Sequence, residues 1–264
     1  MILPVLSIFA AMLAVMSAAW FAQRRAANGG WVDVFWSFGT GLCCAGAILF
    51  ASQEGVLWRR ALIGALTITW SVRLGAYIAG RVLRGPEDVR YAALRREWGA
   101  DYDRRLLRFV LIQAPVSAIL VTAVLYAARQ PDPAFGALDG VGLAVAFGAI
   151  VGEAAADRQM KRFKSDPANE GKVCDGGLWA WSRHPNYFFE AVLWLAFPIV
   201  GTDLGNIWSL SSWLAPPVMA AVLRYGSGVP PLEAAMVRSK GDAYRRYQAR
   251  VPALVPRWPK NTGF

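Results

Sequence analysis

The sequence has little of the chemistry that metal sites and disulfide frameworks need. Its 264 residues include three cysteines and one histidine. Cys43 and Cys44 fall inside an apolar stretch, and Cys174 stands alone, so no spacing typical of metal ligands is present. We therefore expect no metal site built from His and Cys.

Charge is also scarce. Only 17% of the residues are charged, 56% are hydrophobic, and the mean hydropathy is positive. A soluble domain of this length would carry more charge. The apolar residues gather in blocks of which most are long enough to cross a bilayer, namely residues 3–21, 31–52, 61–79, 110–128, 138–156, 186–201 and 207–223. The sequence therefore predicts an all-α integral membrane protein with seven transmembrane helices in a single domain, residues 1–264.

The distribution of positive charge predicts the topology. The basic pair Arg24-Arg25 follows the first block, which is not the pattern of a cleavable signal peptide. With the N-terminus outside, the inward segments hold 24 of the 28 Lys and Arg residues. The positive-inside rule thus predicts an outside N-terminus and a cytoplasmic C-terminus. Because the charges flank the spans, we expect no nucleic-acid partner.

Four ionisable residues fall inside the predicted spans at similar depths near the cytoplasmic side: Asp33, Arg73, Glu153 and Glu190. Burying such a group costs a few kcal/mol on insertion scales, which makes each a functional candidate. The alternative is that they form structural ion pairs that hold helices together.

Three inward stretches combine cations with polar and aromatic side chains, at residues 81–108, 157–177 and 182–187. Pro185 suits the first turn of a helix. Cations beside a helix N-terminus can bind a phosphorylated ligand. The alternative is a solvated inner face attracted to anionic lipid. His184, taken alone, is more often a hydrogen-bonded structural residue than a catalyst.

Seven motifs resemble the steroid 5α-reductase-like membrane family, and more closely its bacterial branch: Val32–Trp36, Trp70–Gly75, Asp88–Tyr91, Asp175–Trp179, Ser182–Glu190, Ser227–Glu233 and Tyr247–Pro256. The stretch from Arg183 to Tyr187 is less specific, because isoprenylcysteine and phospholipid methyltransferases of the same superfamily carry a similar one.

The resemblance implies a seven-helix fold in a bacterial inner membrane, in which residues 1–128 enclose an apolar substrate and residues 129–264 hold NADPH. By the same resemblance, the cofactor would be bound by Arg73, Tyr77, Asp157, Lys161, Lys164, Lys172, Arg183, His184, Asn186, Tyr187, Glu190, Arg224 and Tyr247. The number of cations exceeds what a pyrophosphate needs, which favours NADPH over NADH because a 2′-phosphate is an extra partner.

The sequence departs from the steroid reductases at the substrate carbonyl. Those enzymes use a Gln-Glu pair at the start of the second span and a Tyr in the third. Here these positions hold Asp33 and Trp70, and Gln53-Glu54 is predicted on the opposite side of the membrane. We therefore take Asp33 and Tyr77 as candidate catalytic acids that would hydrogen-bond a developing enolate.

These features predict an NADPH-dependent reductase of an activated carbon–carbon double bond in a steroid-like or other lipophilic substrate, surrounded by membrane lipid and without an obligatory protein partner. One alternative is an S-adenosylmethionine-dependent lipid or isoprenylcysteine-type methyltransferase. Such enzymes show an adjacent Glu-Glu pair, whereas Glu233 is followed by two alanines. The other is a non-catalytic lipid-binding membrane protein.

Overall fold

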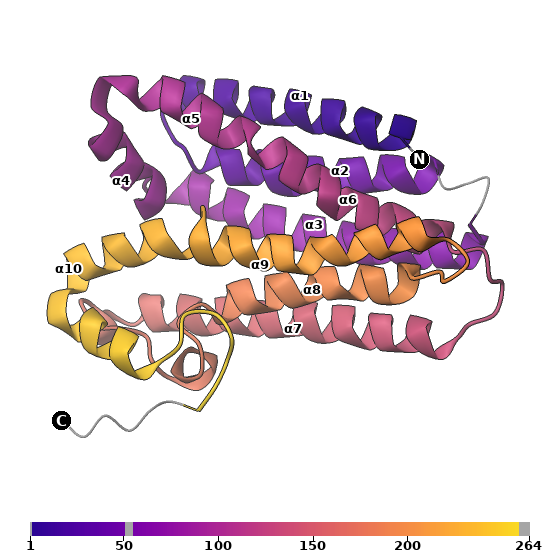
Figure 1. Ribbon diagram of the computed structural model, residues 1–264. Coiled ribbons are helices and arrows are strands. Elements are labelled where there is room, and N and C mark those ends of the chain that lie inside the picture. Colours follow the sequence, from indigo (N-terminus) through magenta and orange to yellow (C-terminus); the bar gives the residue numbers. More distant parts are fainter. Residues whose placement is uncertain (1, 51–54, 259–264) are drawn as a thin grey trace. The chain divides into compact units, whose positions relative to one another are not determined.

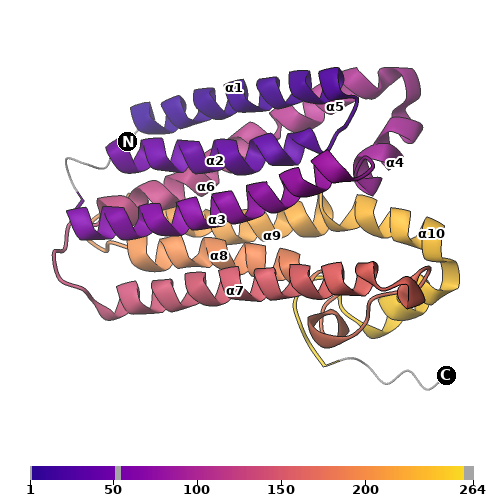
Figure 2. The ribbon, with the colours of Figure 1, turned by 180° about the vertical axis from the view of Figure 1, so that it is seen from behind.

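The computed structural model describes residues 2–50 and 55–258, so Gln53 and Glu54 fall outside the described part. Every regular element within it is a helix, which confirms the predicted all-α class (Figures 1 and 2). With η denoting a 3₁₀ helix, the elements are α1 Ile2–Ala26, α2 Trp31–Phe50, α3 Leu57–Arg84, α4 Val89–Trp98, η2 Gly99–Asp101, α5 Tyr102–Leu111, α6 Gln113–Arg129, α7 Ala137–Ser165, η3 Pro167–Asn169, η4 Gly177–Ala180, α8 Pro185–Gly201, η5 Ile207–Leu214, α9 Ala215–Tyr225 and α10 Val229–Arg250.

Five helical segments of the described chain are long and apolar enough to cross a membrane: Leu3–Ala26, Trp31–Phe50, Leu57–Arg84, Val89–Arg129 and Ala137–Ser165. Each of them overlaps one of the first five predicted blocks. The last two blocks correspond to α8, which has 17 residues, and to η5 followed by the 11-residue α9. The structure therefore supports a chain with five candidate spans, and the count of seven stays a prediction.

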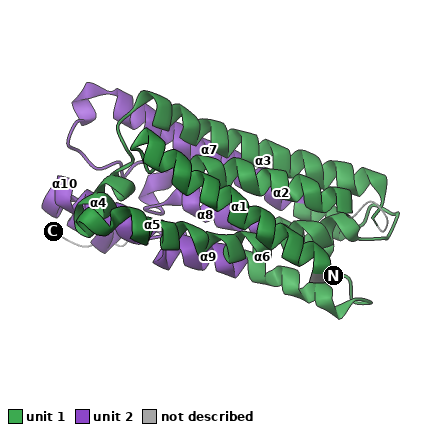
Figure 3. Cartoon of the chain, turned by 90° about the horizontal axis from the view of Figure 1, so that it is seen from above, with its two compact units in different colours: residues 1–142, 195–215 green, residues 143–194, 216–264 purple. Residues whose placement is uncertain are grey.

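The chain divides into two compact units, coloured separately in Figure 3. Unit 1 comprises Met1–Gly142 and Leu195–Ala215, and unit 2 comprises Leu143–Trp194 and Pro216–Phe264. Unit 1 thus contains α1 to α6 and η5, while unit 2 contains most of α7 and α8 together with α9 and α10. The predicted division at residue 129 lies at a different place and stays a prediction.

The core of unit 1 contains an aromatic pair and a close helix contact at a glycine. Trp36 of α2 packs edge-on against the buried Trp70 of α3, with ring centroids 5.8 Å apart. The Trp36 indole also donates a 2.8 Å hydrogen bond to Ser117 of α6. Gly75 lets α3 approach α2, because a Cβ there would lie 2.7 Å from the Phe38 ring. Trp70 is therefore a packing residue between helices.

The two ends of unit 1 differ in charge. One end holds α4 and the C-terminal ends of α1 and α3, while the N-terminus lies at the other (Figure 1). The α4 end carries eight exposed arginines, namely Arg24, Arg25, Arg81, Arg84, Arg96, Arg104, Arg105 and Arg108. This is the end that the charge pattern predicts to face the cytoplasm.

At the opposite end of unit 1, Arg59 is a buried clamp. It falls between the predicted spans 31–52 and 61–79, and it stands in the first turn of α3 with 2% of its surface exposed. Its guanidinium forms two hydrogen bonds to Asp139, at 2.8 and 2.9 Å. It also donates to the backbone carbonyls of Gln130, Asp132 and Ala134. One side chain thereby fixes the connection between α6 and α7.

Candidate functional site

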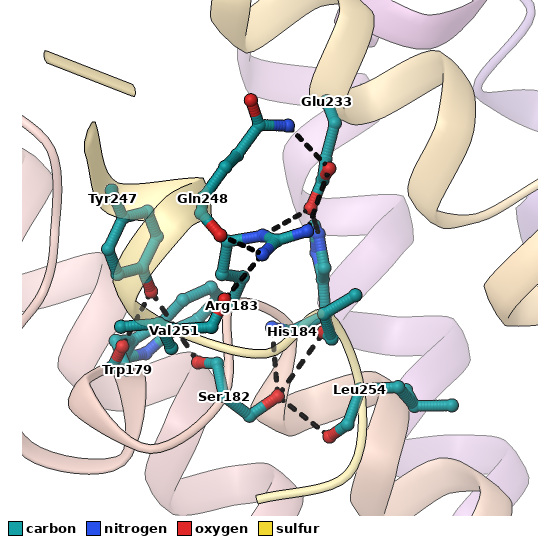
Figure 4. Close-up of polar contacts among 10 residues, drawn as sticks. Trp179, Ser182, Arg183, His184, Glu233, Tyr247, Gln248, Val251 and Leu254 are labelled. Carbon is teal, nitrogen blue, oxygen red and sulfur yellow. Dashed lines mark hydrogen bonds and ion pairs between the residues drawn. The ribbon is translucent and has the colours of Figure 1, made fainter. Parts of the chain in front are cut away.

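The residues predicted to bind a cofactor gather mainly in unit 2, around the start of α8. Pro185 is the first residue of α8, as predicted, and needs no donor there because its nitrogen carries no hydrogen. The preceding residues, Ser182 to His184, are held by α10 and by the segment that follows it (Figure 4). The site can thus be built outward from this turn.

Glu233 of α10 is the centre of the polar network in Figure 4. Its carboxylate accepts two hydrogen bonds from the Arg183 guanidinium, at 2.6 and 3.1 Å. Gln248 donates to it at 2.7 Å, and the His184 ring nitrogen Nε2 lies 2.9 Å away. The other side of the Arg183 guanidinium donates to the carbonyls of Gln248 and Val251. A bidentate pair of this kind fixes both partners in orientation.

The protonation states in this network follow from burial and charge. Burial alone would raise the pKa of Glu233, but the hydrogen bonds from His184, Arg183 and Gln248 outweigh it and lower that pKa to about 2. Burial lowers the pKa of His184 below its ordinary value, and the neighbouring Glu233 offsets this only in part. At neutral pH, Glu233 is therefore a carboxylate and His184 is neutral, with Nε2–H as the donor between them.

Backbone contacts attach the C-terminal segment to the same turn. The Arg183 amide donates to Pro252 O at 2.9 Å, and the Ser182 hydroxyl donates to Leu254 O at 2.8 Å. The Tyr247 hydroxyl donates to Trp179 O at 2.5 Å. Arg183, His184 and Tyr247 are thus joined in one network. Their predicted contact with a cofactor stays a prediction.

A second cluster of unit 2 consists of buried acids and an amide. Glu153 and Asp157 of α7 and Glu190 of α8 are each no more than 6% exposed. The Asn186 amide donates to Asp157 at 3.4 Å, and the indole of Trp194 donates to Glu190 at 3.0 Å. The structure thus brings Asp157 and Asn186 together from two helices.

Close packing of α7 on α8 makes this meeting possible. A Cβ at Gly152 would lie 2.4 Å from the Phe189 ring, so only glycine fits without a shift. The Trp179 indole donates to Ala156 O at 3.2 Å and fixes the η4 turn against the same helix. The acidic and amide groups are therefore held by rigid elements.

The predicted cations of unit 2 differ in exposure. Lys161 and Lys164, near the C-terminal end of α7, are exposed, as is Lys172 in the following loop. Arg224 of α9 is half-buried. Tyr187 is half-buried and stacks on His184, with ring centroids 5.4 Å apart.

In unit 1, Asp33 is held by two donors from α4. Arg90 donates to one of its oxygens at 2.5 Å and the Tyr91 hydroxyl to the other at 2.8 Å. Arg90 in turn is oriented by Asp88, the N-cap of α4, at 2.9 Å. Burial alone would raise the pKa of Asp88, but Arg90 and Arg81 lower it well below its ordinary range. The two hydrogen bonds from Arg90 and Tyr91 occupy both carboxylate oxygens of Asp33 as acceptors.

The remaining unit 1 candidates lie on α3. Arg73 and Tyr77 are half-buried, and the Arg81 guanidinium lies over the Tyr77 ring at 5.9 Å. Tyr77 keeps its place as a candidate hydroxyl donor. Within residues 2–50 and 55–258, no group of three or more His, Cys, Asp and Glu side chains is placed to hold a metal ion.

Sequence reasoning did not identify Glu233 and Gln248 as partners of Arg183, nor Arg90 and Tyr91 as partners of Asp33. Asp88, two residues before Arg90, has the spacing of an N-cap and indicates the start of α4. No local signal indicated either set of contacts, since both join residues 50 or more positions apart.

Comparison with known proteins places these motifs in a family. A family model described as "Protein of unknown function (DUF1295)" matches residues 19–251, and this family is the steroid 5α-reductase-like group. The uncharacterized protein C594.04c of Schizosaccharomyces pombe (strain 972) is 29% identical over 228 residues. That alignment covers 75% of this chain and 64% of the yeast protein, so the chain spans less than two thirds of its length. No solved structure matches. The family-level resemblance is confirmed, and the chain belongs to the DUF1295 family.

Proposed function

We propose that the protein is a membrane-embedded, NADPH-dependent reductase of an activated carbon–carbon double bond in a steroid-like or other lipophilic substrate. The proposal includes seven transmembrane helices, an outside N-terminus, and the bacterial branch of the family in an inner membrane. Membrane lipid surrounds it, and no protein partner is required.

One observation carries the proposal: unit 2 combines a buried acid–amide cluster with three exposed lysines. Asp157 and Asn186 offer an acceptor and an amide within 3.4 Å of each other, which suits a carboxamide that both donates and accepts. Lys161, Lys164 and Lys172 are exposed and suit phosphate groups. The donor set therefore fits a phosphorylated nicotinamide nucleotide.

Each residue then has a defined task. When bound, NADPH supplies a hydride to the substrate. Asn186 and Glu190 orient the reactive end, while the network around Glu233 keeps the start of α8 in place. In unit 1, Tyr77 is the hydroxyl donor for the substrate oxygen. Asp33, which already accepts from Arg90 and Tyr91, is a positioning carboxylate in this scheme.

The methyltransferase alternative shares part of this chemistry. Buried carboxylates such as Glu153, Asp157 and Glu190 also suit a sulfonium cation. S-adenosylmethionine carries no phosphate, however, so it gives the three lysines no partner. In addition, Glu233 is engaged by Arg183 and His184. Both differences favour the reductase.

The first test compares nucleotides on purified protein in lipid nanodiscs. Titration by intrinsic fluorescence should give tighter binding for NADPH than for NADH, with S-adenosylmethionine weakest, and NADPH affinity should fall as salt rises. Lys161→Gln, Lys164→Gln and Lys172→Gln should each weaken NADPH binding by about three- to tenfold. Lys240→Gln on α10 is the matched control. Tight S-adenosylmethionine binding with no nucleotide binding would replace this proposal by the methyltransferase.

The second test addresses the buried cluster. Asn186→Ala and Glu190→Gln should lower NADPH-dependent reduction of an enone probe, cholest-4-en-3-one, by at least about tenfold while thermal stability stays near wild type. Asn169→Ala, which removes another amide of unit 2, is the control. A fall in thermal stability with nucleotide affinity intact would make Asn186 and Glu190 structural residues.

A further inference from the structure

Unit 1 contains a pocket at the end opposite α4, formed entirely by its own residues. The pocket has a volume of about 290 Å³. The end of α6 and the loop after it line one side, and the end of α8 with the turn into η5 lines the other. The lining residues are Tyr126, Arg129, Gln130, Pro131, Gly201, Asp203, Asn206 and Ser209.

The walls of this pocket are fixed by short-range contacts. A Cβ at Gly201 would lie 2.7 Å from the Ala127 backbone nitrogen, so glycine allows the two helix ends to touch. The Gln130 amide donates to Thr202 O at 3.0 Å across the same junction. The buried Ser209 hydroxyl bonds to both the amide and the carbonyl of Asp203, each at 2.9 Å. The pocket is thus a built feature of the fold.

Its lining carries one charge of each sign. Arg129 supplies a guanidinium, which suits a phosphate, and Asp203 supplies a carboxylate, which suits an ammonium group. Amide and hydroxyl groups of Gln130, Asn206 and Tyr126 complete a polar surface. A small molecule with a phosphate and an amine therefore matches this chemistry better than a purely anionic or apolar one.

The pocket also lies where an apolar helix ends. The candidate span Val89–Arg129 stops at Arg129, whose side chain lines the pocket, and the next span begins at Ala137. Beside the pocket, η5 exposes an apolar face, with Ile207 and Trp208 each 72% exposed. Exposed tryptophan at a span end is typical of the headgroup level of a membrane.

We propose that this pocket binds the zwitterionic headgroup of an aminophospholipid of the phosphatidylethanolamine class. Arg129 contacts the phosphate and Asp203 contacts the ammonium group, while the acyl chains lie along the exposed apolar side chains of η5. The site is separate from the reductase chemistry proposed for unit 2 and does not depend on it.

The test uses the full chain in nanodiscs of phosphatidylethanolamine and phosphatidylglycerol with identical acyl chains in equal amounts. After extraction into detergent, retained lipid is measured by mass spectrometry. The wild-type protein should retain phosphatidylethanolamine over phosphatidylglycerol by about tenfold. Asp203→Asn should abolish that preference, because the amide oxygen can still accept the Gly205 amide while the charge is lost. Arg129→Gln should lower retention of both lipids.

Asp132→Asn is the matched control, because Asp132 accepts the Ala134 amide in the same geometry but does not line the pocket. It should retain lipid like the wild type. Retention of both lipids in the bulk ratio, or equal effects of the two Asp→Asn variants, would overturn the proposal. Displacement of the lipid by an equal concentration of soluble glycerophosphoethanolamine would overturn the lipid assignment and leave the pocket to a soluble zwitterion.

Discussion

Glu233 fixes the turn before α8 through hydrogen bonds with several side chains. Three side chains donate to it, and one of them, Arg183, also holds two backbone carbonyls of the C-terminal segment. Removing the negative charge would leave a half-buried guanidinium without its counter-ion. Removing one partner of a buried ion pair destabilises the folded protein by more free energy than the intact pair contributes.

This arrangement predicts a pH dependence of stability. The pKa of Glu233 is lowered from about 4.5 to about 2 in the folded protein, so its contribution is complete above 4.5 and is lost as pH falls toward 2. His184, whose pKa is lowered, acts in the same direction, since the unfolded chain binds its proton first as pH falls. Glu233→Gln should destabilise the protein by about 2–3 kcal/mol at neutral pH. It should also make the free energy of unfolding less dependent on pH in the acid range.

Thermal unfolding followed by tryptophan fluorescence, between pH 7 and pH 3, measures this effect. Glu170→Gln, which alters an exposed carboxylate of unit 2, should stay within about 0.5 kcal/mol of the wild type. A Glu233→Gln variant with an unchanged acid response would contradict the assignment.

Residue identity alone selected candidate side chains but did not predict which residues they contact. Asp33 stood out because a carboxylate inside an apolar block is costly, and the structure gives it partners that the local sequence could not specify. Trp70 stands where the steroid reductases have a tyrosine, and in this structure it packs on Trp36. Such pairings depend on helix packing, which no local pattern encodes.

At the scale of elements, the Arg59 clamp fixes the connection between α6 and α7. Arg59→Met should leave the Asp139 carboxylate and three carbonyls without their donor, so it should cost about 3–5 kcal/mol. The double variant Arg59→Met with Asp139→Leu should recover part of that loss, because no buried charge remains unpaired.

Thermal unfolding measures the loss, and the rate of proteolysis between residues 130 and 136 reports on the connection itself. Arg60→Met, the adjacent arginine of the same helix, is the control and should remain close to the wild type. If Arg59→Met and Arg60→Met had equal effects, the clamp would not be the stabilising feature.

Apolar blocks located the long helices well, because length and hydropathy act on one segment at a time. Each predicted block overlaps a helix, and Pro185 begins α8 as expected. The blocks missed α4, α5 and α10, whose sequences are rich in arginine and were interpreted as inward loops. These helices carry buried aromatic residues such as Tyr91, Tyr102 and Tyr247, and α4 also has the N-cap Asp88, features that charge counts do not register.

For the whole molecule, the open question is how many times the chain crosses the membrane. Five segments qualify by length and composition, while α8 and the η5–α9 segment are shorter. With an outside N-terminus, either five or seven crossings place both the α4 end of unit 1 and the C-terminal segment in the cytoplasm, so the charge pattern alone does not choose between the two counts. Arg59 lies at the end of unit 1 predicted to face outside, where the positive-inside rule expects few cations. Its charge is paired with Asp139, so it does not oppose the predicted topology.

Cysteine labelling in intact cells separates the two counts. In a Cys174→Ser background, Asp132→Cys and Leu204→Cys should react with a membrane-impermeant maleimide, because both residues are exposed at the end of unit 1 opposite α4. Arg96→Cys and Arg238→Cys should react only after the cells are permeabilised. Labelling of Leu204→Cys demands a crossing by α8, because α7 has already returned the chain to the cytoplasm. Protection of Arg238→Cys then demands a seventh crossing before α10. If Leu204→Cys were protected while Asp132→Cys reacted, α8 would not span, and the five-span count would hold.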